Sequence, residues 1–169
     1  MLINRLILLA LLGSILSSAL TGCDNSSSRR RANQPPQIMD LSFTTEADTP
    51  YNGQLEASDP EGDPVTFLLV TAPTLGTVTV AEEDGSFRYQ PNPGITGKDS
   101  FQVKVDNGNF SQPGSDTATV SVEIVAQTVS FQSYSRAAFA QSADDEPLPV
   151  NGRKFTQDAD ANSYSDLLQ

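Results

Sequence analysis

Hydrophobic and polar residues alternate one by one in several short segments in the middle of the chain. Residues 118–124 read ATVSVEI and residues 101–105 read FQVKV, and the same alternation occurs in 87–89 and 77–80. A period of two places successive side chains on opposite faces of a strand, so that one face is buried and the other is wet. The pattern therefore predicts strands of packed antiparallel sheets.

Turn-forming residues separate these strands at regular intervals. They are Asn52-Gly53, Asp59–Pro64, Pro73–Gly76, Asp84-Gly85, Pro91–Gly97 and Asn107-Gly108. Short strands with this spacing predict an all-β sandwich, and no ten-residue segment between Ile38 and Val125 has a helical period. Asp84-Gly85 is expected to close a hairpin between 76–81 and 86–90, because glycine tolerates the positive φ of such turns.

The first 22 residues have the pattern of a signal peptide. Arg5 precedes the apolar run Leu6–Leu12, and small residues follow it. The run is shorter than the ~20 apolar residues that span a membrane. It ends in Leu20-Thr21-Gly22-Cys23, which resembles the lipobox of bacterial lipoproteins. The resemblance implies cleavage after Gly22 and attachment of diacylglycerol to Cys23, usually with acylation of the new amino terminus; the alternative is an ordinary signal peptide with a chance cysteine.

Lipidation of Cys23 predicts a protein of the bacterial cell envelope, anchored to a membrane. Asp24 resembles the inner-membrane retention signal of enteric bacteria, which would place the protein on the periplasmic face of that membrane; otherwise the outer membrane or the cell surface is expected. Residues 23–32 lack an apolar cluster and are expected to form a flexible tether. The arginines at 29–31 belong either to a solvated linker or to a contact with anionic headgroups.

Residues 33–125 resemble the cadherin-like, Ig-like domains of bacteria. The motifs are NQPP at 33–36, GQLEASDPEGDPVTF at 53–67, GTV at 76–78, DGSFRYQP at 84–91, GKDSF at 97–101 and VDNG at 105–108. The resemblance implies an Ig-like/cadherin-like Greek-key sandwich of about seven strands, used for adhesion or as a spacer. The sequence contains one copy of a unit that commonly occurs in tandem.

Three carboxylates lie on one tight turn: Asp59, Glu61 and Asp63. Asp106 ends a predicted strand, where a sandwich can bring it near that turn. Calcium takes six to eight oxygen ligands, so clustered carboxylates suit it. In the cadherin resemblance these positions are like calcium ligands. Calcium bound by Asp59, Glu61, Asp63 and Asp106 is one expectation, and a solvated acidic turn is the other.

The composition excludes several functions. The chain has 10 Lys+Arg against 21 Asp+Glu, a net charge of −11, which argues against a nucleic-acid partner. It has no histidine and one cysteine, so Ser-His-Asp and Cys-His catalysis, His- or Cys-based zinc sites and internal disulfides are excluded. The adjacent acids at 82–84 lie at a hairpin tip, where water solvates them. The protein is therefore predicted not to be an enzyme.

The last segment, 126–169, is the least regular. Residues 134–143 favour a short helix because alanines dominate, and the remainder is expected to be weakly structured. Its aromatic residues either pack on the sandwich, stay disordered, or form a docking segment. Together these features predict an envelope lipoprotein that acts as a binding or adhesion module for an unknown protein or glycan. The alternative is an accessory lipoprotein of an envelope complex, recruited through this tail.

Overall fold

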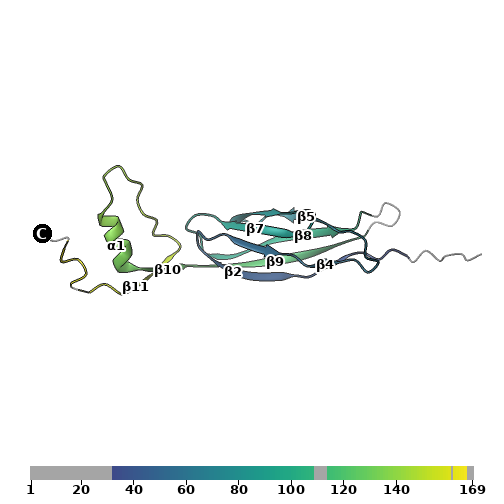
Figure 1. Ribbon diagram of the computed structural model, residues 1–169, viewed down its shortest axis with the longest axis horizontal. Coiled ribbons are helices and arrows are strands. Elements are labelled where there is room, and N and C mark those ends of the chain that lie inside the picture. Colours follow the sequence, from purple (N-terminus) through teal and green to yellow (C-terminus); the bar gives the residue numbers. More distant parts are fainter. Residues whose placement is uncertain (1–31, 109–113, 161, 167–169) are drawn as a thin grey trace, which may run out of the picture. The chain divides into compact units, whose positions relative to one another are not determined.

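The computed structural model describes residues 32–108, 114–160 and 162–166 (Figure 1). All of the described residues belong to one compact unit. The predicted signal peptide, the lipobox with Cys23 and nearly all of the tether lie outside the described residues. Within them, no helix is long and apolar enough to cross a membrane.

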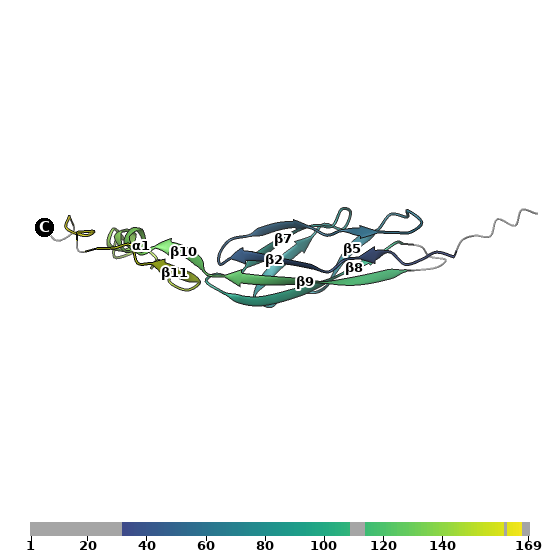
Figure 2. The same ribbon diagram turned by 90° about the horizontal axis from the view of Figure 1, so that it is seen from below.

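Two sheets form a sandwich (Figure 1 and Figure 2). The four-stranded sheet has the order β2 (Leu41–Glu46), β9 (Ser115–Val125), β8 (Gly97–Asp106) and β5 (Thr66–Thr71). The three-stranded sheet has the order β3 (Tyr51–Gln54), β7 (Ser86–Pro91) and β6 (Gly76–Val80). A short pair, β1 (Gln37–Ile38) and β4 (Ala57–Ser58), lies beside them. The predicted all-β, seven-stranded sandwich is confirmed.

One pairing differs from the antiparallel expectation. Strand β2 pairs with β9 in parallel, with Leu41 opposite Val120 and Thr45 opposite Ile124. All other pairs within the two large sheets are antiparallel. A local alternation pattern fixes which face of a strand is buried, but it carries no information on the direction of the partner strand.

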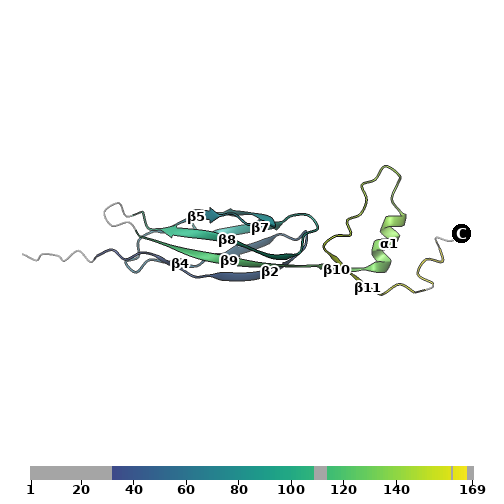
Figure 3. The ribbon, with the colours of Figure 1, turned by 180° about the vertical axis from the view of Figure 1, so that it is seen from behind.

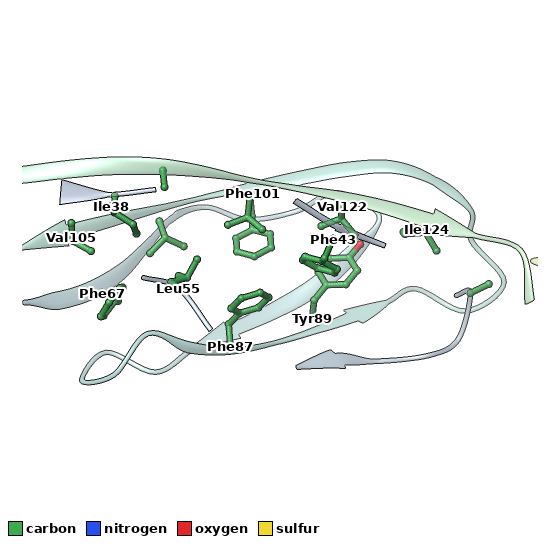
Figure 4. Packing of buried hydrophobic residues seen from close by; sticks show 14 residues of the cluster. Ile38, Phe43, Leu55, Phe67, Phe87, Tyr89, Phe101, Val105, Val122 and Ile124 are labelled. Carbon is green, nitrogen blue, oxygen red and sulfur yellow. The ribbon is translucent and has the colours of Figure 1, made fainter. Parts of the chain in front are cut away.

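The core lies between the sheets and consists of the side chains that the alternation pattern places inward. Phe101, Val103 and Val105 of β8 have no exposed surface, and neither have Ala118 and Val120 of β9. The aromatic members meet in the middle of the sandwich (Figure 4). The ring of Phe43 stacks on that of Tyr51 at 3.9 Å between centroids and contacts Phe87 and Tyr89. The predicted inward faces of β8 and β9 are confirmed.

The expected hairpin is also present. Strands β6 and β7 pair in antiparallel register, with Val80 opposite Phe87. Gly85 has a φ of +71°. A Cβ at Gly85 would lie 2.7 Å from the ring of Phe67, so both the turn and the close packing require glycine there.

The tail has more regular structure than expected (Figure 3). Strand β10 (Gln127–Ser130) pairs in parallel with β11 (Arg153–Thr156), and helix α1 (Phe131–Phe139) connects to β10 directly. The helix begins at Phe131, not Tyr134, because the side chain of Ser130 accepts a hydrogen bond from the N–H of Ser133 and caps its amino end.

Candidate functional site

The acidic turn between β4 and β5 is held by its own first carboxylate. Asp59 Oδ1 accepts hydrogen bonds from the N–H groups of Glu61 at 2.9 Å and Asp63 at 3.2 Å. The N–H of Gly62 donates to the carbonyl of Asp59 at 3.0 Å, with Gly62 at a φ of +81°. The turn is therefore shaped by backbone hydrogen bonds to Asp59.

The second oxygen of Asp59 ties the turn to the end of β8. Asn107 Nδ2 donates to Asp59 Oδ2 at 3.2 Å. Partial burial raises the pKa of the Asp59 carboxyl, but the hydrogen bonds from Asn107 and from backbone N–H groups of the turn outweigh it. The pKa of Asp59 therefore lies below its usual 3.8.

Glu61 and Asp106, two more of the predicted calcium ligands, also accept hydrogen bonds from groups of the protein. Glu61 accepts from the N–H of Gln34 at 2.9 Å and from its Nε2 at 3.1 Å. Asp106 accepts from the N–H of Gly108 at 2.9 Å, and its other oxygen is 3.5 Å from Lys104 Nζ. The structure thus brings the end of β8 to the turn, as expected, but through Asn107 and not through Asp106.

In the part of the chain that the structure describes, no three acidic, histidine or cysteine side chains are grouped so that they can hold a metal ion. Calcium needs six to eight oxygen ligands, and here most of the oxygens already accept hydrogen bonds. Calcium at Asp59, Glu61, Asp63 and Asp106 stays a prediction, to be decided by titration.

Asp99 of β8, which was not among the predicted site residues, is a buried carboxylate with 8% of its surface exposed. It accepts hydrogen bonds from the N–H groups of Thr74 and Leu75, both at 2.9 Å, and from the hydroxyl of Tyr89 at 2.8 Å. Asp99 therefore joins the loop before β6 to strands β7 and β8. The signal was present, because Asp99 has the same inward parity as Phe101, Val103 and Val105.

Burial and hydrogen bonding shift the pKa of Asp99 in opposite directions and that of Tyr89 in the same direction. Burial raises the pKa of Asp99, but the hydrogen bonds that it accepts from three backbone N–H groups and from Tyr89 outweigh this and hold it below its usual 3.8. Burial, together with the bond to Asp99, raises the pKa of the Tyr89 phenol far above its usual value. At neutral pH Asp99 is therefore charged and Tyr89 is neutral. The carboxylate accepts the hydrogen bond that the hydroxyl donates, and this bond stabilises the packing of β7 against β8.

The tail contacts the loops that follow β2 and β7. Asp48, which has a φ of +62°, accepts a hydrogen bond from the N–H of Gly94 at 2.8 Å, and its Oδ2 lies 3.6 Å from Arg153 Nη2. Arg153 Nε also donates to the carbonyl of Pro149 at 3.0 Å, and its Nη1 donates to the side-chain oxygen of Gln127. A Cβ on Gly152 would lie 2.7 Å from the Cβ of Ala47. A hollow of about 580 Å³ is lined by Asp48, Pro93 and Gly94 of the loops and by residues 146–151 and 153 of the tail.

The sequence matches the model of the bacterial Ig domain family over residues 33–123, more than half of the chain. The chain belongs to the bacterial Ig domain family. The matched residues include the sandwich except for the last two residues of β9. No curated protein matches the chain significantly.

Several solved structures align with part of the chain. Cadherin domains 3–6 of Protocadherin Gamma B2 align with a TM-score of 0.47 and 13% identity, covering 57% of this chain and 30% of that one. Mouse Protocadherin-24 domains 1–3 align with a TM-score of 0.43 and 17% identity, over 56% and 35%. An endo-fucoidan hydrolase from glycoside hydrolase family 107 aligns with a TM-score of 0.42 and 20% identity, over 58% and 14%. This chain thus spans about a third or less of each of these proteins.

Proposed function

We propose that the protein is a non-catalytic binding module of the bacterial cell envelope, attached to a membrane by lipid on Cys23. The observation that carries the proposal is the family membership: residues 33–123 match one Ig domain, a fold whose loops and strand edges present recognition surfaces. The net charge of −11 supports a protein or glycan partner and argues against nucleic acid.

The anchor is tested separately from the binding. Cells that express the full chain are labelled with a palmitate analogue, and Cys23→Ser serves as the matched variant. Label in the membrane fraction that the serine variant lacks supports lipidation. Equal label in both, or none in either, contradicts it. Cysteine 23 is the sole cysteine of the sequence, so no second thiol complicates the comparison.

Binding is tested in cells with the gene deleted. Attachment of these cells to one another and to a surface is compared after complementation with the wild-type chain or with Cys23→Ser. Restoration by the wild type alone supports an anchored adhesion module. Restoration by both supports a binder that acts without its anchor. Unchanged attachment after deletion contradicts an adhesive role.

A second candidate function is that of an accessory subunit recruited through the tail. One observation favours it: no residue of α1 is buried, and Phe139 is 72% exposed. Cross-linking and purification from membranes is the test, with the wild type compared with Phe139→Ser. An envelope protein that the wild type captures and the variant loses supports recruitment through α1. Identical captured proteins contradict it.

A further inference from the structure

Strand β5 is the outermost strand of the four-stranded sheet, with β8 on one side and no ladder partner among the described strands on the other. On that side the N–H of Phe67, in β5, donates a hydrogen bond to the carbonyl of Glu82 at 2.9 Å. Alternate residues of an antiparallel strand direct their backbone groups to the same side. Leu69 therefore also directs its N–H and C=O away from β8.

The side chains on either side of Leu69 are apolar and exposed. Leu68 has 52% and Val70 has 54% of its surface exposed. Val70 is the extra residue of a bulge, because Leu69 pairs with Val103 and Thr71 with Gln102. The bulge and the Phe67–Glu82 hydrogen bond limit any added ladder to the few residues around Leu69. A partner must therefore gain most of its contact from Leu68 and Val70.

This edge also lacks the charges that normally protect one. The 18-residue stretch Pro64–Ala81 contains no charged residue, although the chain has a net charge of −11. The opposite edge strand, β2, follows Asp40 and ends in Glu46. Natural edge strands avoid pairing by carrying charges, and β5 carries none. Two copies of this acidic chain repel each other over most of their surfaces, so an uncharged edge is where they approach at the lowest electrostatic cost.

The edge is complementary to itself. Two β5 strands paired antiparallel about a twofold axis through Leu69 place Leu68 of each copy opposite Val70 of the other. The two Leu69 residues then face each other with their unpaired backbone groups. Aliphatic cross-strand pairs of this kind stabilise antiparallel sheets, and a twofold axis repeats each contact. We propose that two copies of the protein associate through their β5 edges in this register, a property that does not depend on the lipid anchor or on any other partner.

Sedimentation equilibrium of the form that begins at Asp24 tests the association, since it contains the whole compact unit 32–169. Leu68→Lys/Val70→Lys is compared with Ser42→Lys/Thr44→Lys, which places two lysines at exposed positions of the opposite edge. Both variants change the net charge equally. We expect a monomer–dimer equilibrium that weakens more than about tenfold in the β5 variant, because like charges then face each other, and that persists in the β2 variant.

Either of two results overturns the proposal: a wild-type protein that stays monomeric at all concentrations, or a β5 variant that dimerises as the wild type does. Far-UV circular dichroism verifies that both variants fold. Salt gives an independent readout. Screening of the repulsion between two acidic chains should tighten the dimer as salt rises, whereas a dimer held by ion pairs should weaken.

Cysteine cross-linking tests the register without adding charge. The form that begins at Asp24 contains no cysteine. A mixture of Leu68→Cys and Val70→Cys proteins should form a mixed disulfide dimer on oxidation, because these residues lie opposite each other in the proposed register. Leu68→Cys alone should cross-link poorly. Equal cross-linking in the mixture and in each single variant would contradict the register.

Discussion

The sandwich and the tail both contain strands and aromatic side chains, but only the sandwich encloses them. Tyr89 and Phe101 have no exposed surface, and they belong to a continuous core between two sheets. In the tail, Phe155 contacts Tyr134 at 4.8 Å between centroids, yet no residue of α1 is buried. Phe139, at the end of that helix, is 72% exposed.

The difference shows that aromatic content does not determine how much a segment contributes to stability. A two-stranded sheet is marginal by itself, and β10 and β11 have no third strand among the described residues. The tail therefore depends on its contacts with the end of the sandwich, which include Arg153 with Asp48 and Gly152 with Ala47. The sandwich should unfold as a cooperative unit, and the tail should open at a lower free energy.

The largest expected effect comes from replacing one phenylalanine by alanine in the sandwich and comparing it with the same replacement in the tail. Phe101→Ala should lower the free energy of unfolding by about 3–5 kcal/mol, because it leaves a cavity in a closed core. Phe139→Ala should change it by less than about 0.5 kcal/mol. Urea unfolding followed by circular dichroism measures both. Equal losses would show that the tail shares the core of the sandwich.

Asp99→Asn should cost about 3 kcal/mol, since a buried donor left without an acceptor costs about 1–3 kcal/mol and Asp99 accepts several bonds. The control is Asp84→Asn, at the exposed tip of the β6–β7 hairpin. A loss of unfolding free energy no greater than that of the control would show that the hydrogen bonds of Asp99 do not stabilise the packing of β7, β8 and the loop before β6.

The same residue predicts a pH dependence. The pKa of Asp99 in the folded protein lies below the usual 3.8. A depressed pKa means that its contribution is fully present above the unfolded value and is lost as pH falls through the folded one. The wild type should therefore lose more stability than Asp99→Asn as pH falls below about 4. If the free energies of unfolding of the wild type and of Asp99→Asn change in parallel with pH, the pH dependence does not come from Asp99.

Arg153→Ala should loosen the tail and spare the sandwich. The change removes the bond to Pro149, the bond to Gln127 and the ion pair with Asp48. If the free energy of local opening of the tail falls by about 1.4 kcal/mol, proteolysis after Val125 should become about tenfold faster. The melting temperature of the sandwich should change little. Limited proteolysis with mass spectrometry measures it. The matched control is Lys154→Ala, at the exposed neighbouring position; equal cleavage of both variants would assign no role to the Arg153 contacts.

Calcium has the smallest expected effect. A site of millimolar affinity would stabilise the sandwich by about 1.4 kcal/mol at ten times its dissociation constant. Thermal unfolding with and without calcium should show this shift if the acidic turn binds the ion, and Asp63→Asn should abolish it while Asp84→Asn should not. A melting temperature that calcium does not alter would reduce the turn to a solvated loop shaped by Asp59.

Much of the sandwich could be predicted from the sequence. Alternation identified the inward residues of β8 and β9, and Asp84-Gly85 identified the hairpin between β6 and β7. These are local properties: the period of two and the positive φ of a glycine depend only on nearby residues. The same parity pointed to a buried Asp99, although a charged residue at an inward position was not recognised as part of the core.

Other features could not be predicted in this way. The β10–β11 pair joins segments that are separated by α1 and a long loop, and each strand has only four residues. Strands this short show too little alternation to be distinguished from a loop. At the acidic turn, the sequence placed Asp106 beside Asp59, whereas the structure places Asn107 there. A shift of one residue at the end of a strand reverses which side chain faces the turn.

The sequence by itself determined the sandwich class, the inward faces of its strands, the strongly acidic charge and the lipobox-like Cys23, because each is written in the order and type of neighbouring residues. Only the tertiary structure decided that β2 pairs in parallel with β9, that Arg153 meets Asp48, and that β5 forms an edge. These features depend on which distant segments become neighbours. That choice is made by the packing of the whole core, not by any local pattern.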